Sequence, residues 1–277
     1  MPDSCTISVI VATYNRPDAL QAVLEGCFDQ TDTNFDLIVA DDGSGSATQE
    51  CVAALQARSP VPLRHVWQPD QGFRLSLARN RGILAARGDY LLFLDGDCIP
   101  RRDYIAQHRR LAERGFMVTG SRILLGRETT EQVLSGKLDV RPQGILAKIG
   151  LRLRGRVGKL PQQLLTLPDI GRRRRRFSFR RIKGCNLGVW RADLEHVNGF
   201  DESFLGWGYE DSDLVARLFN AGVMRKDGAY ATEVLHLWHY DAPRDQAASN
   251  QRLVQQRLAD RTTLALRGLR QHAAQRA

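Results

Sequence analysis

The chain has 277 residues, of which 43% are hydrophobic, and can bury the core of one large α/β domain or of one domain with an appendage. Its five cysteines are irregularly spaced and contain no C-x-x-C pair, which argues against a disulfide framework or a zinc cluster and favours a reducing cytosol. The sequence shows no secretory signal and no run of about 18 apolar residues, so we expect a cytoplasmic protein, soluble or peripheral at the inner face of the cytoplasmic membrane.

The net charge of +9 is concentrated in one segment. Residues 141–183 contain 14 lysines and arginines against the single acid Asp169, so this segment carries +13 and the rest of the chain −4. Such a basic insert attracts phosphate, whether of anionic lipid headgroups, of a phosphorylated saccharide or of nucleic acid.

Strand and helix patterns alternate through the first 94 residues. The patterns predict strands at 6–12, 35–40, 63–68 and 90–94, separated by helices at 17–29, 47–58 and 75–86. Strands that alternate with helices of this length form a mostly parallel sheet, whose ligands lie beyond the carboxyl ends of the strands.

After residue 97 the pattern loosens. We expect a helix at 102–114, a strand at 116–125, an irregular basic insert at about 136–183, a strand at 186–190, a helix at 209–221 and a last strand at 230–237. The polar tail, residues 246–277, is predicted to be a helix.

Two aspartates follow the fourth predicted strand, in the motif Asp95-Gly96-Asp97. Carboxylates two residues apart at a strand end can share one hard cation, and a cation that bridges diphosphate oxygens neutralises the charge on a departing nucleoside diphosphate. The alternative is a solvated turn.

A second acidic pair, Asp41-Asp42, follows the second predicted strand. A carboxylate there can accept the ring N–H of uracil or guanine and so fix a nucleotide base. Alone, this pair is more typical of an Asx turn that leads into a helix, whereas together with Asp95-Gly96-Asp97 it favours base recognition.

A third acidic group, Glu210, Asp211 and Asp213, opens an apolar helix after Gly-Trp-Gly at 206–208. One carboxylate can hold acceptor hydroxyls while its neighbour, with a pKa raised by the adjacent charge, removes a proton from the attacking hydroxyl. Trp207 offers an apolar face on which a sugar ring can stack. Acidic residues that complement a helix dipole are the alternative.

Two histidines, His236 and His239, follow the last predicted strand. Imidazole is a ligand for manganese-like ions as well as for zinc, so the pair is a candidate for further metal ligation, with a satisfied structural histidine as the alternative.

Together these residues resemble family two glycosyltransferases of the GT-A fold. The markers in the first half are the segments 8–15, 41–44, 78–82 and 93–97. The segments 198–202 and 206–211 are similar to the carboxyl-terminal region shared by β-1,4-galactosyltransferases and bacterial chondroitin-polymerase-type enzymes. The similarity covers residues 5–135 and 183–240. The basic insert has no counterpart in the family, and the polymerases' second transferase domain is missing from this sequence, so we expect no processive polymerisation.

The resemblance implies roles for individual residues. It implies donor contacts for Thr13, Asp42, Arg74, Asp95 and Asp97. The implied metal ligands are Asp97 and His236, and His239 is the further candidate. Asp211 is the implied catalytic base, with Glu210 and Trp207 as acceptor-binding residues.

The resemblance also implies a GT-A, Rossmann-like, mostly parallel sheet flanked by helices. The expected divisions are a nucleotide-sugar half at 1–125, the basic insert, an acceptor and catalytic half at 184–240, and a C-terminal helical extension at 241–277. The expected activity moves a sugar, with inversion, from a nucleoside-diphosphate donor to a saccharide or lipid-linked acceptor. We expect the donor to be UDP-linked and the reaction to depend on Mn²⁺ or Mg²⁺. The expected setting is the assembly of bacterial surface polysaccharide or lipopolysaccharide. From its charge, the insert is expected to contact an anionic membrane surface or a phosphorylated, lipid-linked acceptor.

Two rival interpretations remain from the sequence. A nucleic-acid-binding protein would use the arginines at 172–176 for phosphate contacts, but it leaves the three acidic clusters unexplained, and we expect no nucleic-acid partner. An inactive relative would bind a nucleotide sugar without turnover, and the intact Asp95, Asp97 and Asp211 argue against it.

Overall fold

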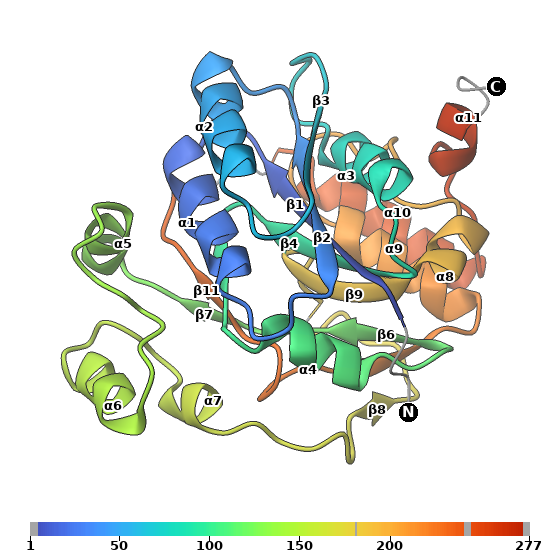
Figure 1. Ribbon diagram of the computed structural model, residues 1–277. Helices are drawn as coiled ribbons and strands as arrows, with labels where there is room; N and C mark the ends of the chain where they lie inside the picture. The colour runs from blue at the N-terminus through green and yellow to red at the C-terminus, as the bar shows by residue number, and fades with distance from the viewer. Residues whose placement is uncertain (1–4, 181, 241–244, 274–277) are drawn as a thin grey trace.

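The computed structural model describes residues 5–180, 182–240 and 245–273, and within these residues an eight-stranded sheet has the order β3-β2-β1-β4-β9-β6-β10-β8 (Figure 1). The pairs β1–β2, β1–β4, β2–β3 and β6–β10 are parallel, whereas β9 is antiparallel to both β4 and β6, and β8 is antiparallel to β10. The strands are β1 (Ile7–Thr13), β2 (Phe35–Asp41), β3 (Leu63–Trp67), β4 (Tyr90–Asp95), β6 (Phe116–Thr119), β8 (Arg173–Arg174), β9 (Asn186–Trp190) and β10 (Met224–Asp227).

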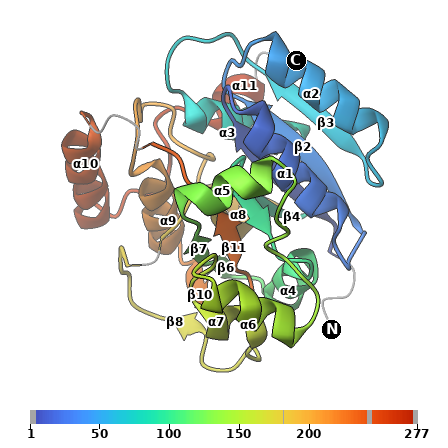
Figure 2. The same cartoon turned by 90° about the vertical axis from the view of Figure 1, so that its left-hand side faces the viewer.

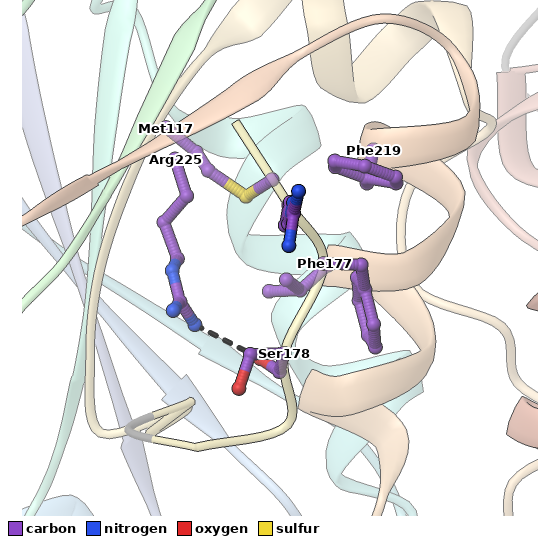
Figure 3. A pocket seen from close by; sticks show the side chains of 7 residues that line it. Met117, Phe177, Ser178, Phe219 and Arg225 are labelled. Carbon is purple, nitrogen blue, oxygen red and sulfur yellow. Dashed lines mark hydrogen bonds between the residues drawn. The ribbon is translucent and has the colours of Figure 1, made fainter. Parts of the chain in front are cut away.

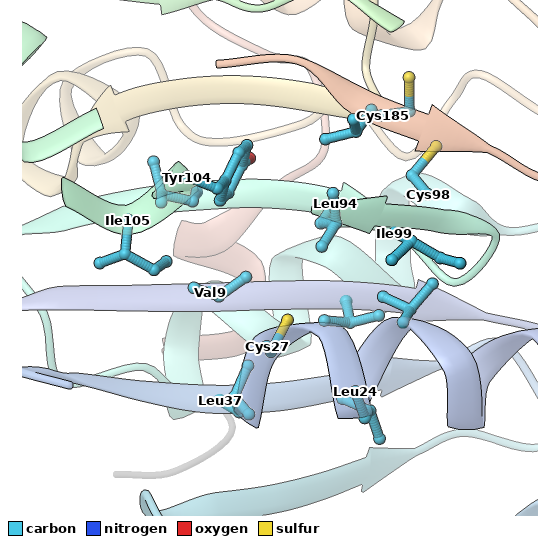
Figure 4. Close-up of a cluster of buried hydrophobic side chains, with 14 of the residues drawn as sticks. Val9, Leu24, Cys27, Leu37, Leu94, Cys98, Ile99, Tyr104, Ile105 and Cys185 are labelled. Carbon is cyan, nitrogen blue, oxygen red and sulfur yellow. The ribbon is translucent and has the colours of Figure 1, made fainter. Parts of the chain in front are cut away.

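Helices cover both faces of this sheet because successive side chains of a strand point to opposite faces. On β1, Val9 and Val11 belong to one buried cluster, part of which Figure 4 shows, and Ile10 belongs to a second cluster. The first cluster includes residues of α1 (Pro17–Phe28), α2 (Ser46–Ala57) and α4 (Tyr104–Leu111). The second includes residues of α3 (Leu75–Ala85), α8 (Arg191–His196) and α9 (Glu210–Asn220). The continuous apolar runs of the first half therefore form a mostly parallel sheet, as predicted.

A small second sheet has the order β5-β11-β7, from β5 (Cys98–Pro100), β11 (Val234–His236) and β7 (Arg122–Leu124). The single strand predicted at 116–125 was therefore wrong, because β6 and β7 belong to different sheets. The chain leaves the large sheet at Gly120, where the Asn186 side chain occupies the space of any added Cβ, 2.1 Å away. The strand predicted at 230–237 is shortened to β11, and β10, which sequence reasoning missed, precedes it.

The basic segment is more ordered than predicted. It contains α6 (Ile145–Leu153), α7 (Leu160–Leu164) and β8, and it follows α5 (Arg127–Leu134). Figure 2 shows α5, α6 and α7 on the side of the molecule that also carries β7 and β11.

The end of the basic segment is fixed to the body of the protein. Arg225 of β10 donates to the carbonyls of Ser178 and Arg180, at 3.1 and 3.0 Å, and Phe177 packs against Phe219 of α9 (Figure 3). Arg172 is only 5% exposed and donates to backbone carbonyls, among them those of Asp227 and Leu167. The nucleic-acid interpretation gave Arg172 a phosphate contact, but its buried guanidinium donates to backbone carbonyls instead.

The C-terminal tail forms two helices, α10 (Ala247–Ala259) and α11 (Leu269–Ala273), instead of the single helix predicted. The chain turns between them at Arg261, which has a left-handed φ of 51°. Arg257 of α10 reaches Asp201 at 2.6 Å and Asp213 of α9 at 3.1 Å, so α10 is attached to α9 by buried ion pairs. Residues 241–244 and 274–277 of the predicted extension lie outside the described residues. No described helix combines the length and apolar character that crossing a bilayer requires.

Candidate active site

The small sheet brings the predicted metal ligands together. β5 and β11 pair so that His236 lies opposite Cys98, next to Asp97. The Nε2 atoms of His236 and His239 lie 3.7 and 3.2 Å from the two carboxylate oxygens of Asp97. Burial lowers the pKa of His236, which favours the neutral imidazole that a metal ion needs. One carboxylate and two imidazoles fit a Mn²⁺-like cation, so the donor set supports the predicted site.

Cys98 belongs to the same cluster, although sequence reasoning did not single it out. Burial raises the pKa of its thiol well above the usual value, so the thiol stays protonated. Its Sγ donates to Asp97 Oδ1 at 3.3 Å. Cys98 therefore orients the carboxylate.

A buried guanidinium joins the two acidic motifs. Arg79 of α3 is 1% exposed, and its Nη2 donates to Asp95 at 2.8 Å while its Nη1 donates to Glu210 at 3.2 Å. Arg79 belongs to the family marker at 78–82, but it was not predicted as a site residue. An arginine in a helix that packs on the buried strands β1 and β2 needs a buried acidic partner, and this requirement could have identified it. Arg79 thus fixes the motif Asp95-Gly96-Asp97, hereafter the DGD motif, relative to the start of α9.

Asp211 is held by backbone donors. Its Oδ2 accepts from the N–H of Gly184 at 2.7 Å, and its Oδ1 accepts from the N–H of Ser212 at 2.6 Å. A Cβ at position 184 would lie 3.0 Å from the Asp211 Cβ and 3.1 Å from Arg79, so only glycine lets the three groups meet without displacement. The predicted base therefore occupies a defined position.

Glu210 and Trp207 lie at the loop that opens α9. The loop turns through left-handed residues, Gly206, Gly208 and Tyr209, with φ values of 71°, 104° and 71°. Trp207 is 40% exposed, as stacking on a ring requires. Burial, followed by the charge of Asp211, raises the pKa of Glu210 from 4.5 to about 7, while Arg79 opposes this rise. Glu210 is therefore a carboxyl group that takes up a proton near neutral pH.

The predicted nucleotide-binding residues also meet. The N–H of Asp42 donates to the Thr13 carbonyl at 3.0 Å, and the Asp42 carboxylate accepts from the N–H of Arg74 at 2.8 Å. The guanidinium of Arg74 instead holds its own loop, through Gln71 at 2.7 Å and the Pro69 carbonyl at 2.5 Å.

Thr13 links this group to the DGD motif. A Cβ added to Gly96 would lie 3.2 Å from Thr13 Oγ1, so the two positions are in close contact. That hydroxyl is buried and has no hydrogen-bond partner among the described residues. An unsatisfied buried hydroxyl is costly, and a bound ligand would satisfy it.

A pocket of about 240 Å³ opens beside His239. Arg16, Arg127 and Glu131 supply polar groups, and Trp238 and Tyr240 supply aromatic rings. The pocket therefore offers both cationic groups and ring faces next to the proposed metal ligands.

The fold is that of GT-A glycosyltransferases. A mannosyltransferase from Pyrobaculum calidifontis, solved with GDP-Man and Mn²⁺, superposes with a TM-score of 0.57 and 17% identity over 94% of this chain and 64% of its own. TarS from S. aureus superposes with a TM-score of 0.62 and 15% identity over 92% of this chain and 41% of its own. At these identities the likeness shows the fold alone, and it confirms the predicted GT-A class.

The chain belongs to glycosyl transferase family 2, whose model matches residues 8–181. A second model, described as the N-terminal domain of galactosyltransferase, matches residues 170–239. The two matches together span residues 8–239, and the resemblance found from the motifs is confirmed.

Curated relatives include validoxylamine A glucosyltransferase of Streptomyces hygroscopicus subsp. jinggangensis, 29% identical over 78% of this chain and 52% of its own length. Chondroitin synthase of Escherichia coli is 27% identical over 78% of this chain and 32% of its own. Hyaluronan synthase of Pasteurella multocida is 30% identical over 81% of this chain and 24% of its own. The chain thus spans about half or less of the length of these relatives.

Proposed function

We propose that the protein transfers a sugar, with inversion, from a nucleoside-diphosphate donor to a saccharide or lipid-linked saccharide. The observation that carries this proposal is the continuous link Asp95–Arg79–Glu210, which sets the DGD motif opposite the carboxylates that open α9. Donor and acceptor groups then meet between two fixed acidic clusters. We place the reaction in bacterial surface polysaccharide or lipopolysaccharide assembly, in line with the polysaccharide synthases among the relatives.

The donor end of the site consists of Thr13, Asp42 and the DGD motif. The buried Asp42 carboxylate faces the loop that contains Arg74, where it can accept the ring N–H of a uracil base. Two structures that share the fold, TarS residues 1–349 with UDP and the Pyrobaculum calidifontis mannosyltransferase with GDP-Man, hold a nucleoside diphosphate or its sugar, and we propose UDP as the nucleotide for this chain. Arg74 would act on the donor mainly by shaping its loop.

Asp97, His236 and His239 would hold Mn²⁺ or Mg²⁺, which supplies positive charge against the diphosphate leaving group. Asp211 accepts the proton of the attacking acceptor hydroxyl, and its carboxylate is aimed by the N–H of Gly184. The acceptor oxygen forms a bond to the anomeric carbon as the bond to the diphosphate breaks on the opposite face, and this displacement inverts the configuration.

Glu210 and Trp207 would bind the acceptor. A carboxyl group with a pKa near neutrality can hold a sugar hydroxyl as acceptor or as donor, and the exposed indole offers a face for the ring.

Sugar-nucleotide screening tests the proposal directly. Purified protein is supplied with UDP-sugars, Mn²⁺ and saccharide acceptors, and UDP release is measured with and without EDTA. Asp211→Asn preserves size and hydrogen bonding but cannot take the proton, so turnover should fall by about 10²-fold or more while donor binding persists. Asp260→Asn, which changes an exposed carboxylate at the end of α10, is the matched control. Full turnover in EDTA would reject the metal, and full turnover in Asp211→Asn would reject the base.

We also propose that the acceptor is reached at an anionic membrane surface, which residues 141–183 contact through their charge of +13.

A further inference from the structure

Helix α6 turns its apolar side away from the protein. Ile145, Leu146 and Leu153 are 64%, 84% and 82% exposed, whereas Leu151 is only 5% exposed. At 100° per residue, these three side chains and that of Ile149 fall within one sector of about 100°, and Leu151 lies on the opposite side. A helix on the surface of a soluble protein normally buries such a sector, so α6 has an apolar face with no covering element among the described residues.

Cationic side chains border this apolar face. On the same helical projection Lys148 and Arg152 lie along one edge, and Arg154 caps the helix. Arg152 and Arg154 are exposed and form no ion pair with any residue that the structure describes. Other cations of the insert are neutralised, since Arg156 pairs with Glu128 at 2.6 Å and Arg173 pairs with Glu113 at 2.8 Å. Arg175 and Arg176 are also exposed and have no ion pair among the described residues, but only at α6 do such cations lie on one helix with exposed leucines.

The basic segment is attached to β7 and α5, and β7 is the neighbour of the strand that carries His236. Lys159 Nζ donates to the carbonyl of Arg122 in β7 at 2.7 Å, and Glu128, the partner of Arg156, lies on α5. In β7, Leu124 lies opposite His236 of β11, so the strand that holds the attachment point is the direct neighbour of the strand that carries this proposed metal ligand. Figure 2 shows α6 and α7 on the same side as β7 and β11. A surface bound by α6 would thus lie on the metal side of the molecule.

We propose that α6 is an interfacial anchor, which inserts its leucine face between the headgroups of an anionic lipid bilayer while its arginines contact lipid phosphate. The occupant is a bilayer because an acidic protein or a nucleic acid would match the cations and leave the leucines exposed to water, whereas an anionic bilayer satisfies both. Membrane binding by α6 does not depend on the proposed function. Only the role given to this binding, the approach to a lipid-linked acceptor, rests on the proposed function. Within residues 141–183, we assign the membrane contact to α6.

Vesicle co-sedimentation tests the anchor. The wild type should bind vesicles that contain phosphatidylglycerol and should bind pure phosphatidylcholine vesicles weakly. The double variant Leu146→Gln/Leu153→Gln should lower partitioning by about tenfold or more, because two leucines no longer leave water. The double variant Leu264→Gln/Leu266→Gln is the matched control, since these leucines are 43% and 72% exposed but lie in the C-terminal extension. Equal partitioning of the two double variants would overturn the anchor.

The charge contribution needs a separate variant. Arg152→Gln/Arg154→Gln should lower binding to anionic vesicles by severalfold per arginine and reduce its salt dependence, with little effect on pure phosphatidylcholine. Vesicle binding that depends neither on phosphatidylglycerol nor on salt concentration would contradict the proposed contact between the arginines and lipid phosphate. A wild type that binds single-stranded DNA and does not bind vesicles would replace the bilayer by a nucleic acid and overturn the proposal. The replaced side chains are exposed, so equal melting temperatures are expected and verify that each variant is folded.

Activity separates this inference from the proposed function. The α6 variants should keep wild-type UDP release with a soluble acceptor and lose transfer to a lipid-linked acceptor in vesicles. Asp211→Asn should show the reverse, with full vesicle binding and little turnover. Vesicle binding that depends on α6 in a protein without transferase activity would reject the proposed function alone, and turnover without dependence of binding on α6 would reject the anchor alone.

Discussion

The burial of His108 predicts how stability changes with acidity. This histidine of α4 is fully buried, its Nε2 lies 3.2 Å from Asn186 Oδ1, and its Nδ1 has no partner among the described residues. Burial penalises the charged imidazole and lowers the pKa of His108 from 6.5 to about 4. The folded protein therefore keeps the ring neutral over a range in which the unfolded chain takes up a proton.

The sign and size of the effect follow from this difference in pKa. Because the folded pKa lies below the unfolded pKa, acid favours the unfolded state, and stability falls as the pH drops from about 6.5 to about 4. At about 1.4 kcal/mol per pKa unit, the full interval from 6.5 to about 4 lowers the free energy of unfolding by about 3 kcal/mol. Below pH 4 this contribution no longer changes.

Urea unfolding at a series of pH values measures this contribution as a difference between proteins. His108→Gln keeps a polar group toward Asn186 and cannot be charged, so its packing cost is an offset that does not vary with pH. Relative to the wild type, the variant should gain about 3 kcal/mol as the pH falls through this window. The control is His196→Gln on α8, which makes the same substitution at an exposed imidazole. A flat difference for His108→Gln would refute the reasoning.

Three further predictions concern the active site. The pKa of Glu210 shifts in the opposite direction, from the usual 4.5 to about 7 in the folded protein, so the charged carboxylate destabilises the folded state above neutral pH. In unfolding experiments Glu210→Gln should therefore gain about 3 kcal/mol of stability relative to the wild type between pH 4.5 and pH 8, and a difference that does not change with pH would contradict the raised pKa. Arg79→Met should lower the free energy of unfolding by about 3–5 kcal/mol, because it leaves the carboxylates of Asp95 and Glu210 without their buried cation, and an unchanged melting temperature would exclude this. His239→Ala should weaken Mn²⁺ binding in calorimetry by about tenfold or more, whereas His196→Ala should match the wild type; equal affinities would remove His239 from the ligand set.

Local sequence patterns were enough for the first half of the chain. Buried parallel strands are continuous apolar runs, so β1, β2, β3 and β4 and the helices between them could be located to within a residue or two. The break between β6 and β7 could not be located, because both segments are strand-like. The chain leaves the large sheet at Gly120, where the Asn186 side chain packs, and Asn186 comes from a distant part of the sequence. The helices of the basic segment were missed because its many cations favoured an irregular insert, although Ile145, Ile149 and Leu153 recur at the helical spacing of four residues.

The sequence by itself determined the GT-A class, the family, and which carboxylates and histidines belong to the candidate site, because these depend on strand ends and short motifs. Tertiary structure alone decided how these motifs are joined. Arg79 comes between Asp95 and Glu210, which are 115 residues apart in the chain, because α3 packs on the large sheet beside the start of α9. The tertiary fold also decided that Arg172 is buried while α6 exposes its leucines, since the burial of a side chain depends on which distant segments cover it.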